Sequence, residues 1–234
     1  MTQTCLVTGA TEGIGRATAF ALGRAGYRVG VCARTAATVA ALVRELKAEG
    51  MAAAGAPCDV ADAEAVPRMV GTITAALGPV DALINNAGIL RVKPFEQITL
   101  EDWDATMAAN VRSLFLTTRE VLPGMRQRKS GTIVNVSSLS GKSGFIGGSA
   151  YCASKHAVMG FSRALMLEVR EDNVRVVAIC PGSVDTKMIR SQDVFPVHPD
   201  RILQPADIAA TILHTLQLPA RALVSEIDIR PTVP

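Results

Sequence analysis

Tyr151 and Lys155 lie four positions apart and could together perform acid–base chemistry. Residues at this spacing share one face of a helix, so a phenol and an ammonium can point into the same cleft. Two unit charges about 4 Å apart interact by roughly 4 kcal/mol at an effective dielectric of about 20, which would lower a phenol pKa from about 10 toward about 7. The same spacing also occurs on solvated helix edges, so the rest of the chain must decide between a catalytic pair and local packing.

Short apolar runs alternate with amphipathic segments along the whole chain. The apolar runs predict strands at residues 4–8, 27–33, 51–58, 80–84, 132–136, 174–179 and 222–229. The amphipathic segments predict helices at residues 17–25, 35–50, 61–77, from Thr99 onward, 151–170, and from Pro205 onward. This alternation predicts an α/β fold in one domain, residues 1–234: a Rossmann-like, doubly wound, seven-stranded parallel sheet with helices on both faces.

Three features of these helices bear on their boundaries and on the site. Pro67 falls within the 61–77 segment, and because an interior proline costs about 3 kcal/mol, we expect the helix to begin later or to kink. Thr99 and Asp102 resemble a capping box that opens a long helix. Asn110 lies in the middle of that helix, where asparagine is a poor residue, so a functional position is plausible there.

The first predicted strand runs into a glycine turn, residues 9–15, and then into a helix. Glycines allow the backbone to approach a pyrophosphate, and a helix N-terminus offers unpaired amides to it. The spacing is Gly-x-x-x-Gly-x-Gly, which differs from the dinucleotide fingerprint, so an ordinary turn is the competing interpretation.

Five polar motifs of the chain each follow a predicted strand. These motifs are residues 9–15, Asp59, residues 85–88, Ser138 and residues 181–186. Because ligands of such sheets bind beyond the carboxyl ends of the strands, we expect these motifs to converge at one edge. Asn85 has a second possible role, which is to tie neighbouring strands through its side-chain amide.

Composition excludes several classes of protein. Hydrophobic residues make up 49% of the 234 positions and charged residues 19%, which is a globular balance. No apolar run reaches the roughly 20 residues of a membrane span, and strand-like sequence beginning at Thr4 leaves no room for a signal peptide, so we expect a cytoplasmic protein without membrane contact. Five scattered cysteines, odd in number, favour buried reduced thiols.

Nucleic-acid and metal binding are not expected either. The net charge of +3 is small, and the basic run at residues 126–129 is more simply a solvated helix end. His156, His198 and His214 have no partner spacing typical of metal ligands and are expected at the surface or in loops.

With these motifs assembled, the chain resembles the short-chain dehydrogenase/reductase family along essentially its whole length. The family's cofactor motif is similar to residues 8–15, its fourth-strand motif to residues 85–88, and its Pro-Gly motif to residues 181–182. Its catalytic residues fall on Asn110, Ser138, Tyr151 and Lys155.

The resemblance implies hydride transfer between a nicotinamide and a carbonyl or secondary alcohol carbon, without a metal. Tyr151 would give or take the proton, Ser138 would hydrogen-bond the substrate oxygen, Lys155 would lower the phenol pKa and hold the nicotinamide ribose, and Asn110 would organise a water path. The implied cofactor-binding residues are Gly9, Thr11, Glu12, Gly13, Ile14, Gly15, Arg34, Asp59, Val60, Asn86, Ala87, Gly88, Tyr151, Lys155, Pro181, Gly182, Val184 and Thr186.

The end of the second strand indicates the cofactor. An NAD site usually presents an acidic residue about 20 residues after the glycine motif, whereas this chain has Ala33, Arg34 and Thr35. Arg34 can pair with a 2′-phosphate, so we predict NADP(H). Glu12 argues the other way, because many NADP-preferring relatives carry a basic residue there.

The substrate is less well defined. Phe145, Ile146, Met188, Ile189 and Phe195 would make a modest pocket for an apolar or medium-sized ketone, with reduction of a 3-oxoacyl thioester as one candidate. The C-terminal segment, residues 225–232, lacks the glycine-rich strand end common in the family.

Two further expectations follow from the resemblance. The alternative to an active enzyme is a catalytically idle NADP(H)-binding sensor or interaction protein on the same fold, which predicts the loss of Ser138, Tyr151 or Lys155; all three are present. A homodimer or homotetramer is expected, formed through the helix after Thr99, the Tyr151 helix and the final strand.

Overall fold

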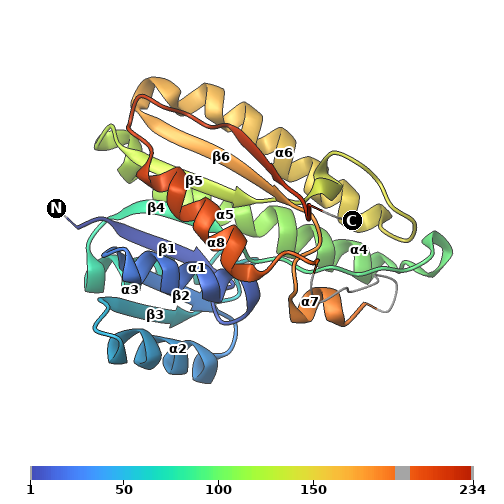
Figure 1. Ribbon diagram of the computed structural model, residues 1–234, viewed down its shortest axis with the longest axis horizontal. Helices are drawn as coiled ribbons and strands as arrows, with labels where there is room; N and C mark the ends of the chain where they lie inside the picture. The colour runs from blue at the N-terminus through green and yellow to red at the C-terminus, as the bar shows by residue number, and fades with distance from the viewer. Residues whose placement is uncertain (1, 193–200, 233–234) are drawn as a thin grey trace.

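The computed structural model describes residues 2–192 and 201–232, and these build one seven-stranded sheet in the order β3-β2-β1-β4-β5-β6-β7 (Figure 1). Every neighbouring pair of strands is parallel. The strands are β1 (Thr4–Thr8), β2 (Arg28–Ala33), β3 (Ala53–Pro57), β4 (Val80–Asn85), β5 (Gly131–Val136), β6 (Val174–Pro181) and β7 (Glu226–Ile229). The predicted doubly wound parallel sheet is therefore confirmed.

Helices cover both faces of the sheet. They are α1 (Gly13–Arg24), α2 (Ala36–Ala48), α3 (Ala65–Leu77), α4 (Leu100–Met107), α5 (Ser113–Gln127), α6 (Ser149–Val169), α7 (Lys187–Arg190) and α8 (Pro205–Gln217), with single 3₁₀ or π turns at η1 (Phe95–Gln97), η2 (Ala108–Arg112), η3 (Leu139–Gly141) and η4 (Arg170–Asp172). One apolar core lies between the sheet and α1, α2 and α8, and the other lies between the sheet and α3, α5 and α6. This two-sided cover explains why the strands are apolar almost throughout.

Several boundaries differ from those the sequence predicts. Helix α1 begins at Gly13 rather than residue 17, because the amide of Arg16 already bonds the Glu12 carbonyl and closes a turn at the glycines. Helix α3 begins at Ala65, which leaves Pro67 in the first turn, where its missing N–H is tolerated. Strand β7 is shorter than expected, since only Glu226–Ile229 pairs with β6.

The predicted capping box is confirmed. The Thr99 hydroxyl accepts from the Asp102 amide (3.1 Å), and the Asp102 carboxylate accepts from the Thr99 amide (3.3 Å). The long helix that follows is not continuous, however. A π turn at Ala108–Arg112 separates α4 from α5, and Asn110 lies inside it.

A buried polar network joins the sheet to α5 and α6. The Asn85 amide donates to Asn135 Oδ1 of the next strand (2.9 Å) and to the Thr118 hydroxyl (3.2 Å), and Asn135 in turn donates to Ser162 (2.9 Å). The strand-tying role of Asn85 is confirmed. All five cysteines are free thiols in buried positions.

The switch point of the topology lies between β1 and β4, where the strand order reverses. The strands point toward the right of Figure 1, so their carboxyl ends, the loop before α4 and the short helix α7 all meet on that side. A crevice at such a point is where doubly wound sheets bind ligands. Within residues 2–192 and 201–232, no helix is long and apolar enough to span a membrane.

Candidate active site

The glycine turn packs directly against the end of β4. Gly9 and Gly13 have positive backbone φ angles of 61° and 50°, which residues with a Cβ atom rarely adopt. A Cβ added to Gly15 would lie 2.3 Å from the Gly9 carbonyl oxygen and 2.5 Å from Asn86 Nδ2. These positions of the turn therefore accept only glycine. Without side chains in the way, the backbone amides of the turn can approach a ligand at the N-terminus of α1.

Thr8 holds the two strand ends together. Its hydroxyl accepts from the amides of Asn86 and Ala87, both at 3.0 Å, while the Asn86 side chain donates to the carbonyls of Thr8 (2.9 Å) and Gly9 (3.2 Å). The structure thus brings the glycine turn and residues 86–88 into one cradle. Sequence reasoning gave Thr8 no role of its own; a hydroxyl at the end of a buried strand was the available signal.

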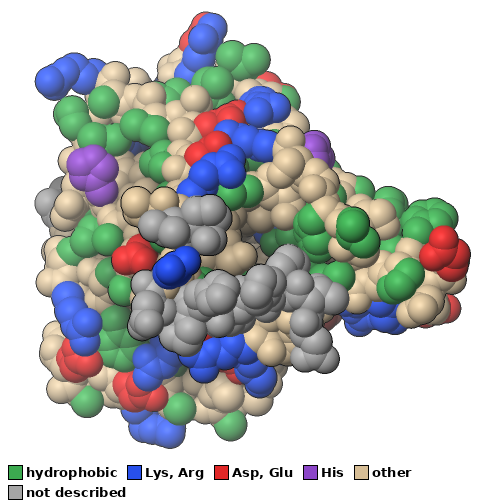
Figure 2. Space-filling view, turned by 45° about the vertical axis from the view of Figure 1, so that its right-hand side comes forward, with side chains coloured by type: hydrophobic (Ala, Val, Ile, Leu, Met, Phe, Trp, Pro, Cys, Tyr) green, Lys and Arg blue, Asp and Glu red, His purple; other side chains and the backbone are tan. Residues whose placement is uncertain are grey.

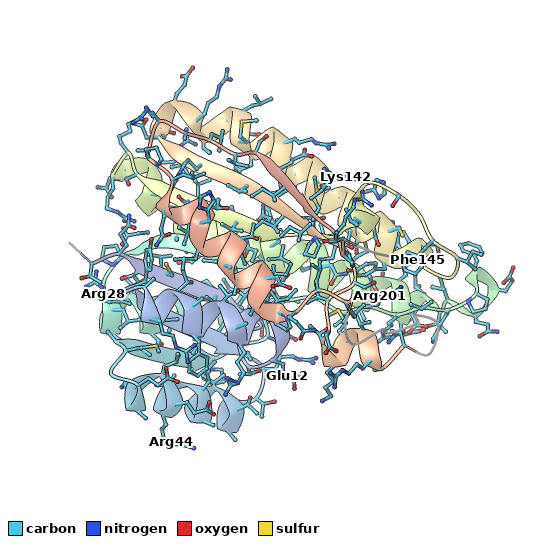
Figure 3. All side chains as sticks on the ribbon, in the orientation of Figure 1. Glu12, Arg28, Arg44, Lys142, Phe145 and Arg201 are labelled. Atoms are coloured by element: carbon cyan, nitrogen blue, oxygen red, sulfur yellow. The ribbon has the colours of Figure 1, made fainter. Side chains whose placement is uncertain are left out.

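Helix α7 covers the other side of the glycine turn. A Cβ on Gly13 would lie 3.0 Å from the Thr186 methyl group, and Lys187 Nζ lies 3.7 Å from Glu12 Oε1. Gly13, Arg16, Thr186 and Lys187 are among the residues that line a cavity of about 390 Å³ between these elements. Figure 3 shows Glu12 on the side of α1 that faces α7. Lys187 therefore offsets the charge of Glu12.

The expected adenine end lies beyond β2 and β3. Arg34 follows β2 as an exposed residue and makes no ion pair in the part of the chain that the structure describes. The amide of Cys58 donates to the Ala33 carbonyl (2.9 Å), which brings the ends of the two strands together, and Val60 is buried. Asp59 accepts from the Ala61 amide at 3.0 Å, so its carboxylate shapes the loop.

Ser138 and Tyr151 meet at the end of β5. The Ser138 hydroxyl hydrogen-bonds the Tyr151 phenol, accepts from the Ser140 amide (3.1 Å) and lies 3.5 Å from the Pro181 carbonyl oxygen. Burial raises the pKa of Tyr151 to about 12, and the bond from Ser138 lowers it only in part. The phenol is therefore neutral across the physiological range.

The expected depression of the phenol pKa by Lys155 is wrong for the protein alone. Lys155 Nζ donates to the Val136 carbonyl at 2.9 Å and lies 5.7 Å from the centre of the Tyr151 ring. Burial also acts on the ammonium, and it lowers the pKa of Lys155 to about 8. Desolvation therefore outweighs the attraction that the spacing suggested.

Asn110 is buried in the π turn, and both the oxygen and the nitrogen of its side-chain amide are hydrogen-bonded. Its Oδ1 accepts from the Ile89 amide (2.7 Å), and its Nδ2 donates to the Ile89 carbonyl (3.0 Å) and the Ser154 hydroxyl (2.9 Å). A Cβ on Gly88 would lie 2.9 Å from Asn110 Oδ1 and 3.8 Å from Lys155 Nζ. Asn110 thus ties the loop after β4 to α6, next to Lys155.

The remaining predicted cofactor residues lie on the same edge. Pro181 ends β6, the Gly182 amide donates to the Ile229 carbonyl (2.8 Å), and buried Val184 forms a bridge with Leu203. Thr11 and Ile14 are half-buried in the glycine turn and the first turn of α1.

The expected substrate residues separate into two groups. The Phe145 ring packs edge-on against Tyr151 with centroids 6.3 Å apart, so it lies at the site. Ile146 is 99% exposed in the loop between η3 and α6. Met188 and Ile189 belong to α7. Figure 2 shows hydrophobic side chains gathered on the part of the molecule that projects to the right in that view. Phe195 lies outside the described residues.

The histidines that the structure describes and the basic run at residues 126–129 contribute no side chain to this edge. His156 and His214 are exposed on helices, and His198 lies outside the described residues. The basic run ends α5 as expected, and Arg126 and Lys129 both pair with Asp172. Among residues 2–192 and 201–232, no group of three His, Cys, Asp or Glu side chains could hold a metal ion.

A doubly wound sheet with a glycine turn at its switch point defines the dinucleotide-binding class of α/β proteins. A family model described as short chain dehydrogenase matches residues 3–194. The chain belongs to the short-chain dehydrogenase family, which confirms the resemblance seen in its motifs, and it is thereby an oxidoreductase.

Individual relatives match over nearly the whole chain. It is 36% identical over 228 residues to a 3-oxoacyl-(acyl-carrier-protein) reductase of Synechocystis, covering 95% of this chain and 92% of that protein. It is 37% identical over 222 residues to an acetoacetyl-CoA reductase of Shinella zoogloeoides, covering 91% and 90%. The crystal structure of a variant of the actinorhodin polyketide ketoreductase with NADPH superposes with a TM-score of 0.91 at 33% identity, covering 98% of this chain and 96% of that one.

Proposed function

We propose that this protein is an NADP(H)-dependent reductase of carbonyl compounds, with 3-oxoacyl thioesters as the substrate class. The observation that carries the proposal is the half-buried, neutral Tyr151 phenol, which Ser138 hydrogen-bonds at the strand edge that also holds the glycine turn. A phenol that is protonated at neutral pH can donate a proton, which is what carbonyl reduction requires. Relatives named as 3-oxoacyl and acetoacetyl-CoA reductases support the substrate class.

Each candidate side chain has one task in this reaction. Bound NADPH supplies the hydride that the carbonyl carbon accepts. Tyr151 gives its phenolic proton to the substrate oxygen, and Ser138 donates a hydrogen bond to that oxygen. Lys155 is protonated below about pH 8 and binds the nicotinamide ribose. Its positive charge stabilises the phenolate of Tyr151 as that phenolate forms. Asn110 helps to organise the path by which Tyr151 regains a proton.

Arg34 supports NADP(H) as the cofactor. It is exposed at the end of β2, where a 2′-phosphate would lie, and no carboxylate pairs with it among the described side chains. The unfavourable charge of Glu12 is offset by Lys187. The structural neighbour described with NADPH supports the same cofactor.

The proposal is tested by following the absorbance of NADPH with acetoacetyl-CoA and a panel of simple ketones. Turnover of acetoacetyl-CoA that exceeds the turnover of the ketones is the expected result. Turnover of ketones alone would overturn the substrate class. A preference for NADH would overturn the cofactor assignment.

The same assay decides the alternative of an idle sensor or interaction protein. That alternative predicts tight NADPH binding with no turnover of any carbonyl compound. The convergence of Ser138, Tyr151 and Lys155 at one edge favours the enzyme.

We also propose that the protein is cytoplasmic and forms a homodimer or homotetramer through α5 and α6. Between these helices lies a groove of about 410 Å³, whose apolar lining includes Phe115, Leu122, Phe161 and Leu165. Phe115 is 47% exposed. Light scattering of the wild type and a Phe115→Glu variant tests this: a monomeric wild type, or an unchanged oligomer in the variant, would contradict it.

A further inference from the structure

The direction of the Ser138 hydroxyl is set by the short turn that follows it. The Ser140 amide donates to Ser138 Oγ (3.1 Å), and the Gly141 amide donates to the Ser138 carbonyl (2.9 Å). The Lys142 amide then bonds the Leu139 carbonyl (2.9 Å). Because Ser138 also hydrogen-bonds the Tyr151 phenol, a shift of this turn would change the geometry at the phenol.

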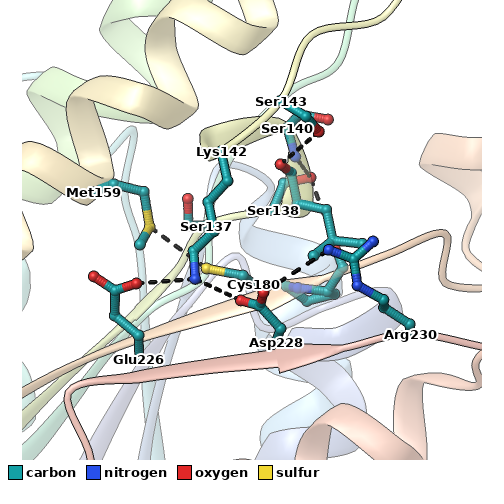
Figure 4. Close-up of polar contacts among 12 residues, drawn as sticks. Ser137, Ser138, Ser140, Lys142, Ser143, Met159, Cys180, Glu226, Asp228 and Arg230 are labelled. Carbon is teal, nitrogen blue, oxygen red and sulfur yellow. Dashed lines mark hydrogen bonds and ion pairs between the residues drawn. The ribbon is translucent and has the colours of Figure 1, made fainter.

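Lys142 fastens the far end of that turn to the edge strand β7. Its Nζ lies 2.7 Å from Asp228 Oδ1 and 2.9 Å from Glu226 Oε2. Figure 4 marks both ion pairs with dashed lines. The two carboxylates raise the pKa of Lys142, and Lys142 together with Arg163 lowers the pKa of Glu226 to about 2. Lys142 and Glu226 are therefore both charged at neutral pH.

Both carboxylates are held by other elements. Glu226 also accepts from Arg163 Nε of α6 at 2.6 Å, and Arg230 Nη2 lies 3.9 Å from Asp228 Oδ2. The backbones at these positions pair with Ala178 and Cys180 of β6. Because α6 carries Tyr151 and Lys155, Lys142 links the Ser138 turn both to the sheet and to the helix of the other candidate catalytic residues.

Apolar packing brings the same three parts together. A Cβ on Gly182 would lie 3.3 Å from Pro231 Cδ and 3.4 Å from Leu139 Cδ1. The segment after β7, the Pro-Gly motif and the Ser138 turn thus touch at one point. A displacement of β7 would therefore also change the packing of Leu139, which follows Ser138 directly.

We propose that Lys142 is a positioning residue of the reductase site: its ion pairs with Glu226 and Asp228 fix the turn that aims the Ser138 hydroxyl at Tyr151. This inference rests on the proposed function. It also gives the C-terminal strand, which departs from the family pattern, a part in building the site. Partly exposed ion pairs contribute little to global stability, so the effect is expected to be local.

The test compares Lys142→Met with Lys142→Arg and with Lys129→Met. Lys129 is a matched control, because it too pairs with a carboxylate, that of Asp172, but at the end of α5. For Lys142→Met, kcat with NADPH and acetoacetyl-CoA falls roughly tenfold while the KM for NADPH stays within about twofold, because the glycine turn is untouched. Hydrogen exchange at residues 138–143 becomes faster. Lys142→Arg keeps the wild-type behaviour, and Lys129→Met changes neither quantity.

Three results would overturn the proposal. These are wild-type exchange at residues 138–143 in Lys142→Met, faster exchange without a loss of kcat, and an equal loss in Lys142→Arg or Lys129→Met. If the wild type reduces no carbonyl compound, the proposed function fails. The exchange data then decide by themselves whether Lys142 holds the turn: faster exchange in Lys142→Met alone supports this, and unchanged exchange refutes it.

Discussion

The ammonium of Lys155 donates to the backbone carbonyl of Val136, 2.9 Å away at the end of β5, while its distance to the centre of the Tyr151 ring is 5.7 Å. The Val136 carbonyl thus anchors the buried ammonium beside the phenol. This arrangement separates two tasks: Ser138 acts on the phenol directly, and Lys155 supplies positive charge close by.

Removal of the Tyr151 hydroxyl is expected to abolish proton transfer and leave the fold intact. In Tyr151→Phe, kcat for acetoacetyl-CoA reduction falls about 10²- to 10⁴-fold, because general acid catalysis contributes that much. NADPH affinity, measured by fluorescence titration, changes little. Tyr27→Phe is the matched control, since Tyr27, the other tyrosine, lies at the amino end of β2, at the edge of the sheet opposite the carboxyl ends of the strands. Turnover of Tyr151→Phe close to the wild-type rate would exclude Tyr151 as the proton donor.

Binding of NADPH is expected to weaken as the pH rises above about 8. Burial lowers the pKa of Lys155 from 10.5 to about 8, so the ammonium is protonated below that pH and loses its charge above it. If the charged form binds the ribose, the Kd at pH 9 is roughly tenfold higher than at pH 7. Isothermal titration calorimetry from pH 6 to pH 9.5 measures this. In Lys155→Met the Kd is higher and does not depend on pH over this range; a wild-type Kd without pH dependence would contradict the prediction.

Arg34 is expected to determine the choice between NADPH and NADH. A charge-assisted bidentate pair contributes about 1.5–3 kcal/mol, so Arg34→Ala raises the Kd for NADPH about 10- to 100-fold and leaves the Kd for NADH nearly unchanged. Arg44→Ala serves as the control, because Arg44 is exposed on α2 and lies away from the strand ends in Figure 3. Equal losses for the two cofactors in Arg34→Ala would show that Arg34 does not contact the 2′-phosphate.

The architecture could be predicted from the sequence, and so could the convergence of the candidate site residues at one edge of the sheet, because both depend on local pattern. Alternating apolar runs give the sheet, and Tyr151 with Lys155 is a four-residue spacing on one helix. The pKa of Tyr151 could not be predicted, since burial is a property of the folded chain and reverses the expected direction. The π turn around Asn110 was equally hidden, because the apolar periodicity continues through it. The ion pair between Lys142 and Asp228 could not be predicted either, because the two residues are separated by 86 positions in the sequence and no local pattern connects them.

Acid stability is expected to depend on Asp102. Lys93 and Arg91 both pair with its carboxylate, and with the Thr99 amide they lower its pKa from 3.8 to about 2. A lowered pKa in the folded state means that the stabilisation is complete above about pH 4 and is lost as the pH falls through about 2. Urea midpoints measured from pH 2 to pH 6 should fall steeply for the wild type and more gently for Asp102→Asn, which starts from a lower stability. Asp104→Asn, a change at an exposed neighbour, should follow the wild type; parallel curves for all three proteins would contradict this.

Two glycine-to-alanine changes are expected to have opposite effects on stability. In Gly88→Ala, the new methyl group would lie 2.9 Å from Asn110 Oδ1 and 3.8 Å from Lys155 Nζ, so either the loop or the Asn110 side chain must move. Because Asn110 is bonded to Ile89 and Ser154, this movement lowers both kcat and the melting temperature. In Gly71→Ala the methyl group meets nothing within 4 Å on the exposed side of α3, and the better helix former raises the free energy of unfolding by about 0.5–1 kcal/mol without changing kcat. Thermal denaturation and steady-state assays of the two variants test both statements, and wild-type kcat in Gly88→Ala would show that the contact between Gly88 and Asn110 is not needed at the site.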